Sequence, residues 1–159
     1  MATNLKSKEE QSFLTFSLNK EEFAIPLLKV CEVIAKPEKI TPIPQSPKHF
    51  VGIINLKGKI ISIINLKEKL EIKNNAFSLP NAAVIVLELN NKSFGILIDQ
   101  VNEVVSTRYY TQSPKPEITS IQNTDYISSI LRKDNRILLE LDVCQALDST
   151  DESLINKSA

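Results

Sequence analysis

The side chains that usually carry catalysis or bind metals are scarce in this chain of 159 residues. His49 is the only histidine, and no motif with a serine, cysteine or aspartate accompanies it. Acid–base catalysis and metal binding need such partners, because they orient the imidazole and complete the site. The residue types therefore predict no catalytic residues, no metal-binding residues and no enzymatic activity.

Nucleotide and phosphate chemistry is also missing from the sequence. Three glycines cannot form a glycine-rich nucleotide-binding loop, and Lys57-Gly58-Lys59 lacks the glycine spacing and the following helix of a phosphate loop. Asp99 and Glu103 are four residues apart, but on a strand they would not form a catalytic pair, and we interpret them as solvated surface. No cofactor is expected.

Composition narrows the classes of partner. The chain has 19 basic and 19 acidic residues, so its net charge of zero predicts no binding to nucleic acid. No apolar run approaches the roughly 18 residues of a membrane span, and residues 1–11 lack the apolar core of a secretion signal. We therefore expect a cytoplasmic protein without membrane insertion. Cys31 and Cys144 lie in apolar segments and are interpreted as reduced core residues rather than as a disulfide or metal pair.

The elements that must position any site are organised around Val51–Leu70. Two runs rich in isoleucine and valine flank the turn at Lys57-Gly58-Lys59, which predicts a β-hairpin. The runs are nearly continuous, which is typical of strands covered on both faces. Asn65 is a candidate cap for a short helix that follows the hairpin.

Similar patterns recur along the chain. Leu27–Ile34 is predicted to begin with a helical turn and continue as a strand, Thr111–Asn123 is predicted to be a loop, and Asp142 is predicted to cap a helix through Leu147. Three further hairpins are predicted, from strand pairs at residues 12–19 and 23–26, 82–89 and 94–98, and 126–131 and 136–141.

The sequence contains an internal repeat. Phe23–Ile34 aligns without gaps on Phe94–Val105, and Lys59–Leu70 aligns on Arg136–Leu147. We interpret the repeat as two equivalent β lobes of five short strands each, closed as small barrels, against the alternative of chance similarity between β segments.

Two features of the repeat are open to a structural or a functional interpretation. Glu32 and Glu103 interrupt apolar runs at the same repeat position, either as outward-facing strand residues or as polar contacts in a binding groove. Three glycines are needed either for backbone geometry alone or for contact with a partner: Gly52, Gly58 and Gly95.

The chain resembles the CheW family of chemotaxis coupling proteins. The resemblance rests on Phe13–Ile34, His49–Leu70 and Phe94–Val105, with support from Arg136–Asp142. It implies an all-β fold with short helices, in which two SH3-like five-stranded barrels surround a shared hydrophobic core. The implied CheW-like domain covers residues 12–148, with lobe one at about 24–80 and lobe two at about 12–23 and 81–148, a flexible N-terminus at 1–11 and a polar tail at 149–159.

The resemblance also implies a function. CheW-like proteins are non-enzymatic adaptors that bind the cytoplasmic tip of methyl-accepting chemotaxis receptors and the regulatory domain of the histidine kinase CheA. The family implies kinase contacts on barrel faces, mainly of the first lobe, and recruitment to membrane-associated arrays. The alternatives are a CheW paralogue that serves a different chemosensory-type kinase and, from another class, an enzyme with a small β-barrel.

Site residues follow from the family's motif positions. The implied receptor-binding residues are Val30, Glu32, Lys57, Gly58, Val101 and Val104. Gly52 and Gly95 match positions that are sensitive to change, through hairpin shape or through a partner. Lys57 stands where the family usually has arginine and lacks the planar fork that makes two-pronged contacts, so a polar receptor contact here is expected to be weaker or differently placed.

Overall fold

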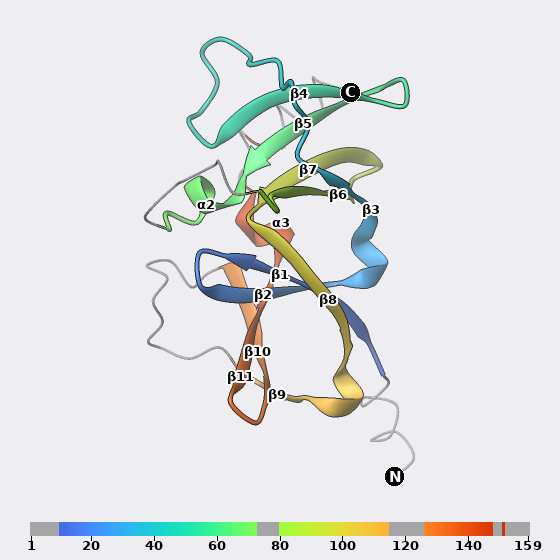
Figure 1. Ribbon diagram of the computed structural model, residues 1–159, viewed down its shortest axis with the longest axis vertical. Helices are drawn as coiled ribbons and strands as arrows, with labels where there is room; N and C mark the ends of the chain where they lie inside the picture. The colour runs from blue at the N-terminus through green and yellow to red at the C-terminus, as the bar shows by residue number, and fades with distance from the viewer. Residues whose placement is uncertain (1–9, 73–79, 115–125, 148–150, 152–159) are drawn as a thin grey trace.

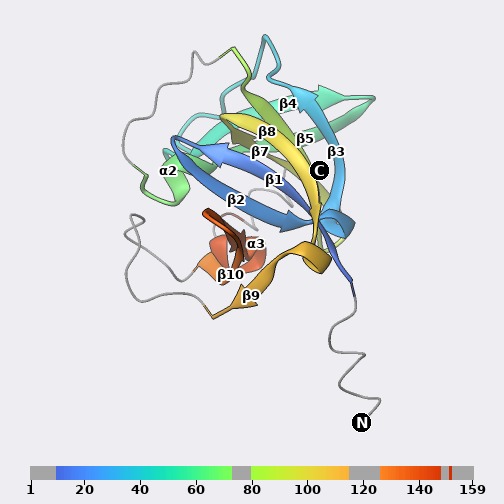
Figure 2. The ribbon, with the colours of Figure 1, turned by 60° about the horizontal axis from the view of Figure 1, so that its bottom comes forward.

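In the described part of the chain, eleven strands form two sheets, each in its own lobe. The computed structural model describes residues 10–72, 80–114, 126–147 and 151. Lobe one, in the upper half of Figure 1, is the sheet β3-β6-β7-β5-β4, and lobe two, below it, is the sheet β8-β1-β2-β11-β10-β9. Both sheets are strongly curved, as Figure 2 shows from a second direction.

The strands and helices have short, well-defined bounds. Lobe one contains β3 (Val30–Ala35), β4 (Phe50–Leu56), β5 (Lys59–Asn65), β6 (Ala83–Leu89) and β7 (Lys92–Ile98). Lobe two contains β1 (Ser12–Leu18), β2 (Glu21–Pro26), β8 (Gln100–Ser106), β9 (Thr111–Ser113), β10 (Ile127–Lys133) and β11 (Arg136–Leu141). The helical turns are η1 (Leu27–Lys29), α2 (Leu66–Lys69), η2 (Thr107–Tyr109) and α3 (Val143–Ala146).

All four predicted hairpins are present. The backbone geometry of a turn explains which residues occupy it. Lys57 and Gly58 both have positive φ, at 53° and 86°, as the tight two-residue turns that suit hairpin twist require. The caps are also confirmed, because the side chain of Asn65 accepts a hydrogen bond from the backbone N–H of Lys67, and that of Asp142 accepts one from Gln145. One prediction is wrong: Thr111–Ser113 is not loop but strand β9, which pairs with β10.

The lobes exchange hairpins in both directions. In lobe two, β1 and β2 lie between β8 and β11, and in lobe one the equivalent hairpin β6–β7 lies between β3 and β5. The predicted assignment of residues 81–98 to lobe two is therefore wrong; residues 12–23 do join lobe two as predicted, and β2 extends that part of the lobe to Pro26. The repeat explains why this is so. Because the two halves are equivalent and the first hairpin of the first half joins lobe two, the first hairpin of the second half joins lobe one.

Alternation along these strands builds a shared core between the lobes and a second core inside each barrel. In β6, Ala83, Ile85 and Leu87 face the shared core, and Val84 and Val86 face the core of lobe one. In β5 of the predicted hairpin, Ile64 likewise lies in the shared core and Ile61 and Ile63 in the core of lobe one, so the predicted coverage of both faces is confirmed for β5, while β4 is only partly covered. The shared core takes residues from both lobes, the largest being Phe16, Phe23, Phe50 and Phe94. The lobe-one barrel core contains Ile54, Ile61, Ile63, Val84, Val86 and Leu97, and the lobe-two barrel core contains Phe13, Ala24, Val105, Leu131 and Leu138.

Two expectations about the periphery need comment. Cys31 and Cys144 are free but exposed, so their interpretation as core residues is wrong. Cys31 lies on the edge strand β3, where only one face is covered, and an apolar sequence run does not reveal an edge. Asp151, from the predicted polar tail, is fully buried, whereas the remainder of the tail and residues 1–9 lie outside the described residues.

Candidate interaction surface

The expected receptor-binding residues come from both lobes. Val30 begins β3 of lobe one and Val101 lies near the start of β8 of lobe two, at equivalent positions of the repeat. Both side chains are half-buried and pack against the shared core. Val104, further along β8, is 52% exposed. The structure therefore places part of an apolar surface on each lobe, with its inner edge fixed by the core between them.

Glu32 and Lys57 are brought together across lobe one. Lys57 lies in the β4–β5 turn, and its Nζ is 3.1 Å from Oε1 of Glu32 on β3. The lysine side chain is 79% exposed, so solvent screens the pair and its contribution to stability is small, about 0–1 kcal/mol. Such a pair can open at little cost, which leaves both charges available to a partner. Gly58 completes the same turn, and its backbone N–H donates to Oδ1 of Asn55.

Lobe two carries a stronger equivalent of this pair. Arg136 at the start of β11 donates from Nε and Nη2 to the two carboxylate oxygens of Glu22, at 2.9 and 2.8 Å, and from Nη1 to Glu103 and to the hydroxyl of Tyr110. These hydrogen bonds lower the pKa of Glu22 and raise the pKa of Arg136. A planar guanidinium makes this two-pronged contact, which a lysine does not.

Sequence reasoning did not predict Arg136 as a site residue. The signal was present in the repeat, which aligns Glu103 with Glu32 and Arg136 with Lys59, next to the turn lysine. Glu32 pairs with Lys57 of the β4–β5 hairpin, and Glu103 pairs with Arg136 of the β10–β11 hairpin, each within its own lobe. Both sites are therefore described better as ion pairs than as isolated strand carboxylates.

The three glycines differ in what holds them. A Cβ at Gly52, where φ is +151°, would collide with the backbone oxygen of Thr41, and a Cβ at Gly95 would lie 2.5 Å from Cγ1 of Val84 in the barrel core. Gly58 has open space around it and needs only its positive φ. Packing and backbone geometry therefore explain the glycine at each of the three positions.

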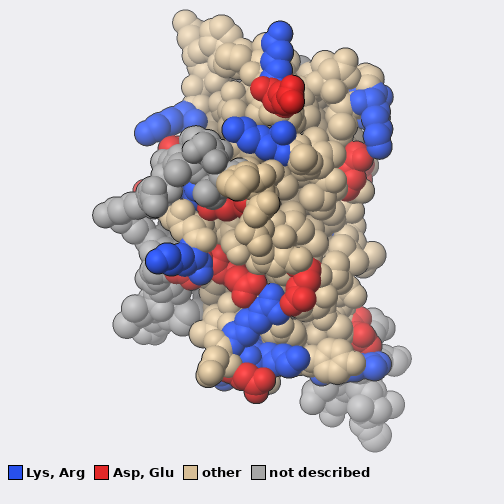
Figure 3. Space-filling view, viewed as in Figure 1, with Lys and Arg blue, Asp and Glu red and all other residues tan. Residues whose placement is uncertain are grey.

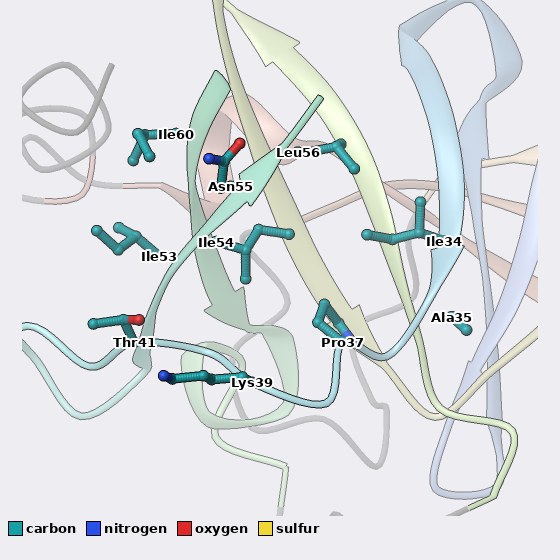
Figure 4. Close-up of a pocket in the computed structure, with 10 residues that line it drawn as sticks. All are labelled: Ile34, Ala35, Pro37, Lys39, Thr41, Ile53, Ile54, Asn55, Leu56 and Ile60. Carbon is teal, nitrogen blue, oxygen red and sulfur yellow. The ribbon is translucent and has the colours of Figure 1, made fainter. Parts of the chain in front are cut away.

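An apolar depression opens at one end of the lobe-one barrel. It has a volume of about 570 Å³ and lies between β3, the β4–β5 hairpin and the segment that follows β3 (Figure 4). Isoleucine and leucine side chains form its walls, while Lys39, Thr41 and Asn55 supply polar groups. The walls are Ile34, Pro37, Ile53, Ile54, Leu56 and Ile60.

Charge on the surface is mixed. On the face in Figure 3, lysine and arginine alternate with aspartate and glutamate, and broad uncharged areas lie between them. Among the described residues, no group of three or more histidine, cysteine, aspartate or glutamate side chains is placed to hold a metal ion. No helix in the described part of the chain has the length and apolar character to cross a membrane.

Comparison with known proteins gives a consistent picture. The model of the CheW-like domain matches residues 12–151. The chain is 32% identical over 149 residues to the chemotaxis protein CheW of Klebsiella aerogenes, covering 94% of this chain and 89% of that one. It is 29% identical to the CheW of Treponema pallidum, over 90% of this chain and 85% of the relative.

A solved structure shares the fold. The crystal structure of the scaffolding protein TtCheW from Thermoanaerobacter tengcongensis superposes with a TM-score of 0.73 at 30% identity, covering 82% of this chain and 88% of the other. The family match runs from β1 past α3 and so includes both lobes, the shared core and every residue of the candidate surface. This chain belongs to the CheW-like family.

Proposed function

We propose that this chain is a non-enzymatic adaptor that couples chemoreceptors to the histidine kinase CheA in a cytoplasmic array at the membrane. The observation that carries the proposal is the family match over residues 12–151, which includes both lobes. Relatives named chemotaxis protein CheW and a scaffolding protein of the same fold support it. A chain that only joins two partners needs surfaces rather than a catalytic centre.

We assign the receptor to the surface that both lobes share. Val30 and Val101 pack against the shared core, and Val104, three residues beyond Val101 on β8, adds exposed apolar area. The stripe of apolar side chains on a receptor helix would bury these valines. The Glu32–Lys57 pair supplies opposite charges beside Val30, where a polar residue of the receptor would replace one partner of the pair.

We assign the kinase to the apolar depression of lobe one. Its walls come from a barrel end that is open to solvent, and Ile60 on its rim is 40% exposed. An exposed apolar surface bordered by polar groups is typical of a protein–protein contact. The depression and the three valines of the proposed receptor surface are different sets of residues. An adaptor could therefore hold both partners at once.

The test is a titration of the protein against a receptor cytoplasmic fragment and against the CheA regulatory domain from the same cell. Val104→Asp and Glu32→Lys should weaken receptor binding about tenfold or more and leave kinase binding unchanged, while Ile60→Asp should do the reverse. Glu71→Lys, a charge reversal at an exposed residue outside both surfaces, is the matched control.

The outcomes separate the alternatives. If the folded wild-type protein binds neither partner at tens of micromolar, the adaptor proposal is wrong. If the receptor and kinase variants each weaken both partners equally, the assignment of two surfaces is wrong. If the protein binds only the regulatory domain of another chemosensory-type kinase from the same cell, it is a CheW paralogue that serves a different pathway.

A further inference from the structure

Helix α2 joins the two lobes through buried charges. Nζ of Lys67 on α2 lies 2.8 Å from Oδ1 of Asp99, and their side chains are 3% and 10% exposed. Asp99 is the residue between β7 of lobe one and β8 of lobe two. Its other oxygen, Oδ2, accepts a hydrogen bond of 2.7 Å from the backbone N–H of Asn19 in the β1–β2 turn, and its own N–H donates to the carbonyl of Ser17.

A second buried charge reaches α2 from the end of lobe two. Asp151, beyond α3, is fully buried, and its Oδ2 is 2.8 Å from Nζ of Lys69 on α2. Its Oδ1 lies within hydrogen-bond distance of Nε2 of His49, just before β4 of lobe one. Asp99 therefore ties α2 to the β1–β2 turn of lobe two, whereas Asp151, which comes after α3 in the sequence, contacts Lys69 and His49 of lobe one.

The equivalent place at α3 has none of these charges. The repeat aligns Lys67 with Cys144, Lys69 with Ala146 and Asp99 with Leu28. Leu28 is 98% exposed there, and a cavity of about 90 Å³ remains between α3 and β6. The α2 side thus carries buried charge pairs, whereas the α3 cavity is lined by Leu87, Leu89, Val143 and Cys144 together with Lys29 and Glu88.

We propose that the Lys67–Asp99 and Lys69–Asp151 pairs form an interlobe bridge that fixes the orientation of lobe one relative to lobe two. Buried ion pairs add little net stability, and in some proteins they instead select one arrangement of the parts that they connect, which is the role we infer here. The valines of the candidate receptor surface come from different lobes, so the bridge also sets their spacing. That last consequence rests on the proposed function, whereas the bridge itself does not.

The chain carries its own probes for the test. Cys31 lies on β3 of lobe one, and Cys144 lies on α3, which follows β11 of lobe two in the chain; both are free and exposed. Spin labels on these two cysteines report the distance between the lobes by double electron–electron resonance, without an engineered site. We expect a single narrow distance distribution for the wild-type protein.

The variant that removes the bridge is Lys67→Met with Asp99→Leu and Lys69→Met. The changes at residues 67 and 99 leave no unpaired lysine buried there, and Asp151 keeps its contact with Nε2 of His49 when Lys69 is replaced. We expect the distance distribution to broaden. Arg108→Met, which breaks the exposed pair with Glu10 within lobe two, is the control and should leave the distribution unchanged.

Two results would overturn the proposal. One is a folded triple variant, with the circular dichroism of the wild type, whose distance distribution is as narrow as before. If the triple variant does not fold, Asp99→Asn decides, since it keeps an oxygen for the Asn19 N–H and removes only the charge; an unchanged distribution would be equally negative. Both measurements need no partner, so a failure of receptor binding would not affect them.

Discussion

At the scale of single residues, Gly95 shows how packing dictates a residue type. It lies in β7, and a Cβ there would be 2.5 Å from Cγ1 of Val84 and 2.9 Å from Cδ1 of Ile63, both in the lobe-one barrel core. We expect Gly95→Ala to lower the free energy of unfolding by about 1–3 kcal/mol through overpacking. Urea denaturation of the variant measures this loss.

Two further variants distinguish overpacking from a direct role in binding. Adding Val84→Ala to Gly95→Ala makes room for the new methyl group, so the pair should lose less stability than the sum of the two single changes. Gly58→Ala meets no neighbour and should lose only about 1 kcal/mol, from its positive φ. Additive losses at residues 84 and 95 would contradict the steric account.

Glu22 makes the stability of the protein depend on pH. The hydrogen bonds from Arg136 lower the pKa of Glu22 in the folded state, so the folded protein binds a proton here less readily than the unfolded chain does. This contribution to stability is complete above the pKa of an unfolded glutamate, near pH 4.3, and is lost as the pH falls through the lower folded value.

Glu22→Gln should therefore reduce the acid sensitivity of folding. Urea denaturation at pH 7 and again near pH 4 should show a smaller loss of unfolding free energy for Glu22→Gln than for the wild type. Glu71→Gln, at an exposed residue, is the control and should follow the wild type. An identical loss in all three proteins would mean that the Arg136 contact does not persist in solution.

The roles of some single residues could be predicted from the sequence, and the roles of others could not. The N-caps Asn65 and Asp142 were predictable, because a cap acts on backbone groups two or three residues away. Arg136 and Lys67 were not predicted, and the interpretation of Asp99 as solvated surface is wrong because it is buried; each of the three meets partners that are distant in the sequence. Lys67 and Asp99 each have an apolar residue on one side and a polar residue on the other, as solvated charges often do, and the meeting of the two lobes buries them.

At the scale of elements, local patterns predicted the hairpins and failed where pairing decides. β9 has three residues and no apolar run, and it exists because β10 offers it hydrogen-bond partners. β3 reads as a buried strand, yet it is an edge strand whose alternate residues face solvent. Hydrophobicity along one segment records burial on average, whereas an edge is a property of the whole sheet.

The two N-caps give a prediction at this scale. Asn65 and Asp142 are equivalent in the repeat, and each begins the short helix that ends its half. Asn65→Ala should lower the free energy of unfolding by about 1 kcal/mol, because the N–H of Lys67 loses its acceptor. Asn65→Asp, which copies the residue of the second half, should recover most of this loss in urea denaturation; no recovery would show that the amide group itself is needed.

At the scale of the whole molecule, neither half of the chain can complete a sheet. The first half holds β3, β4 and β5 of lobe one but lacks β6 and β7, which lie between β3 and β5. The second half holds β8 to β11 of lobe two but lacks β1 and β2, which lie between β8 and β11. The parallel pairs β5–β7 and β2–β11 join the halves, and no local pattern predicts a parallel pair between distant segments.

This exchange predicts how the chain behaves when it is cut between the two halves, after Ile72. Each fragment alone should lack cooperative unfolding, because its strands have lost their central neighbours and half of the shared core. An equimolar mixture should recover the β-sheet circular dichroism and a single thermal transition, since each fragment supplies the hairpin that the other lacks. Cooperative unfolding of either fragment alone would contradict this account, because a lobe built within one half would need no partner. Reassembly would show that the two lobes form one folding unit. An adaptor needs such a unit if the relative orientation of its lobes is to carry a signal between two partners.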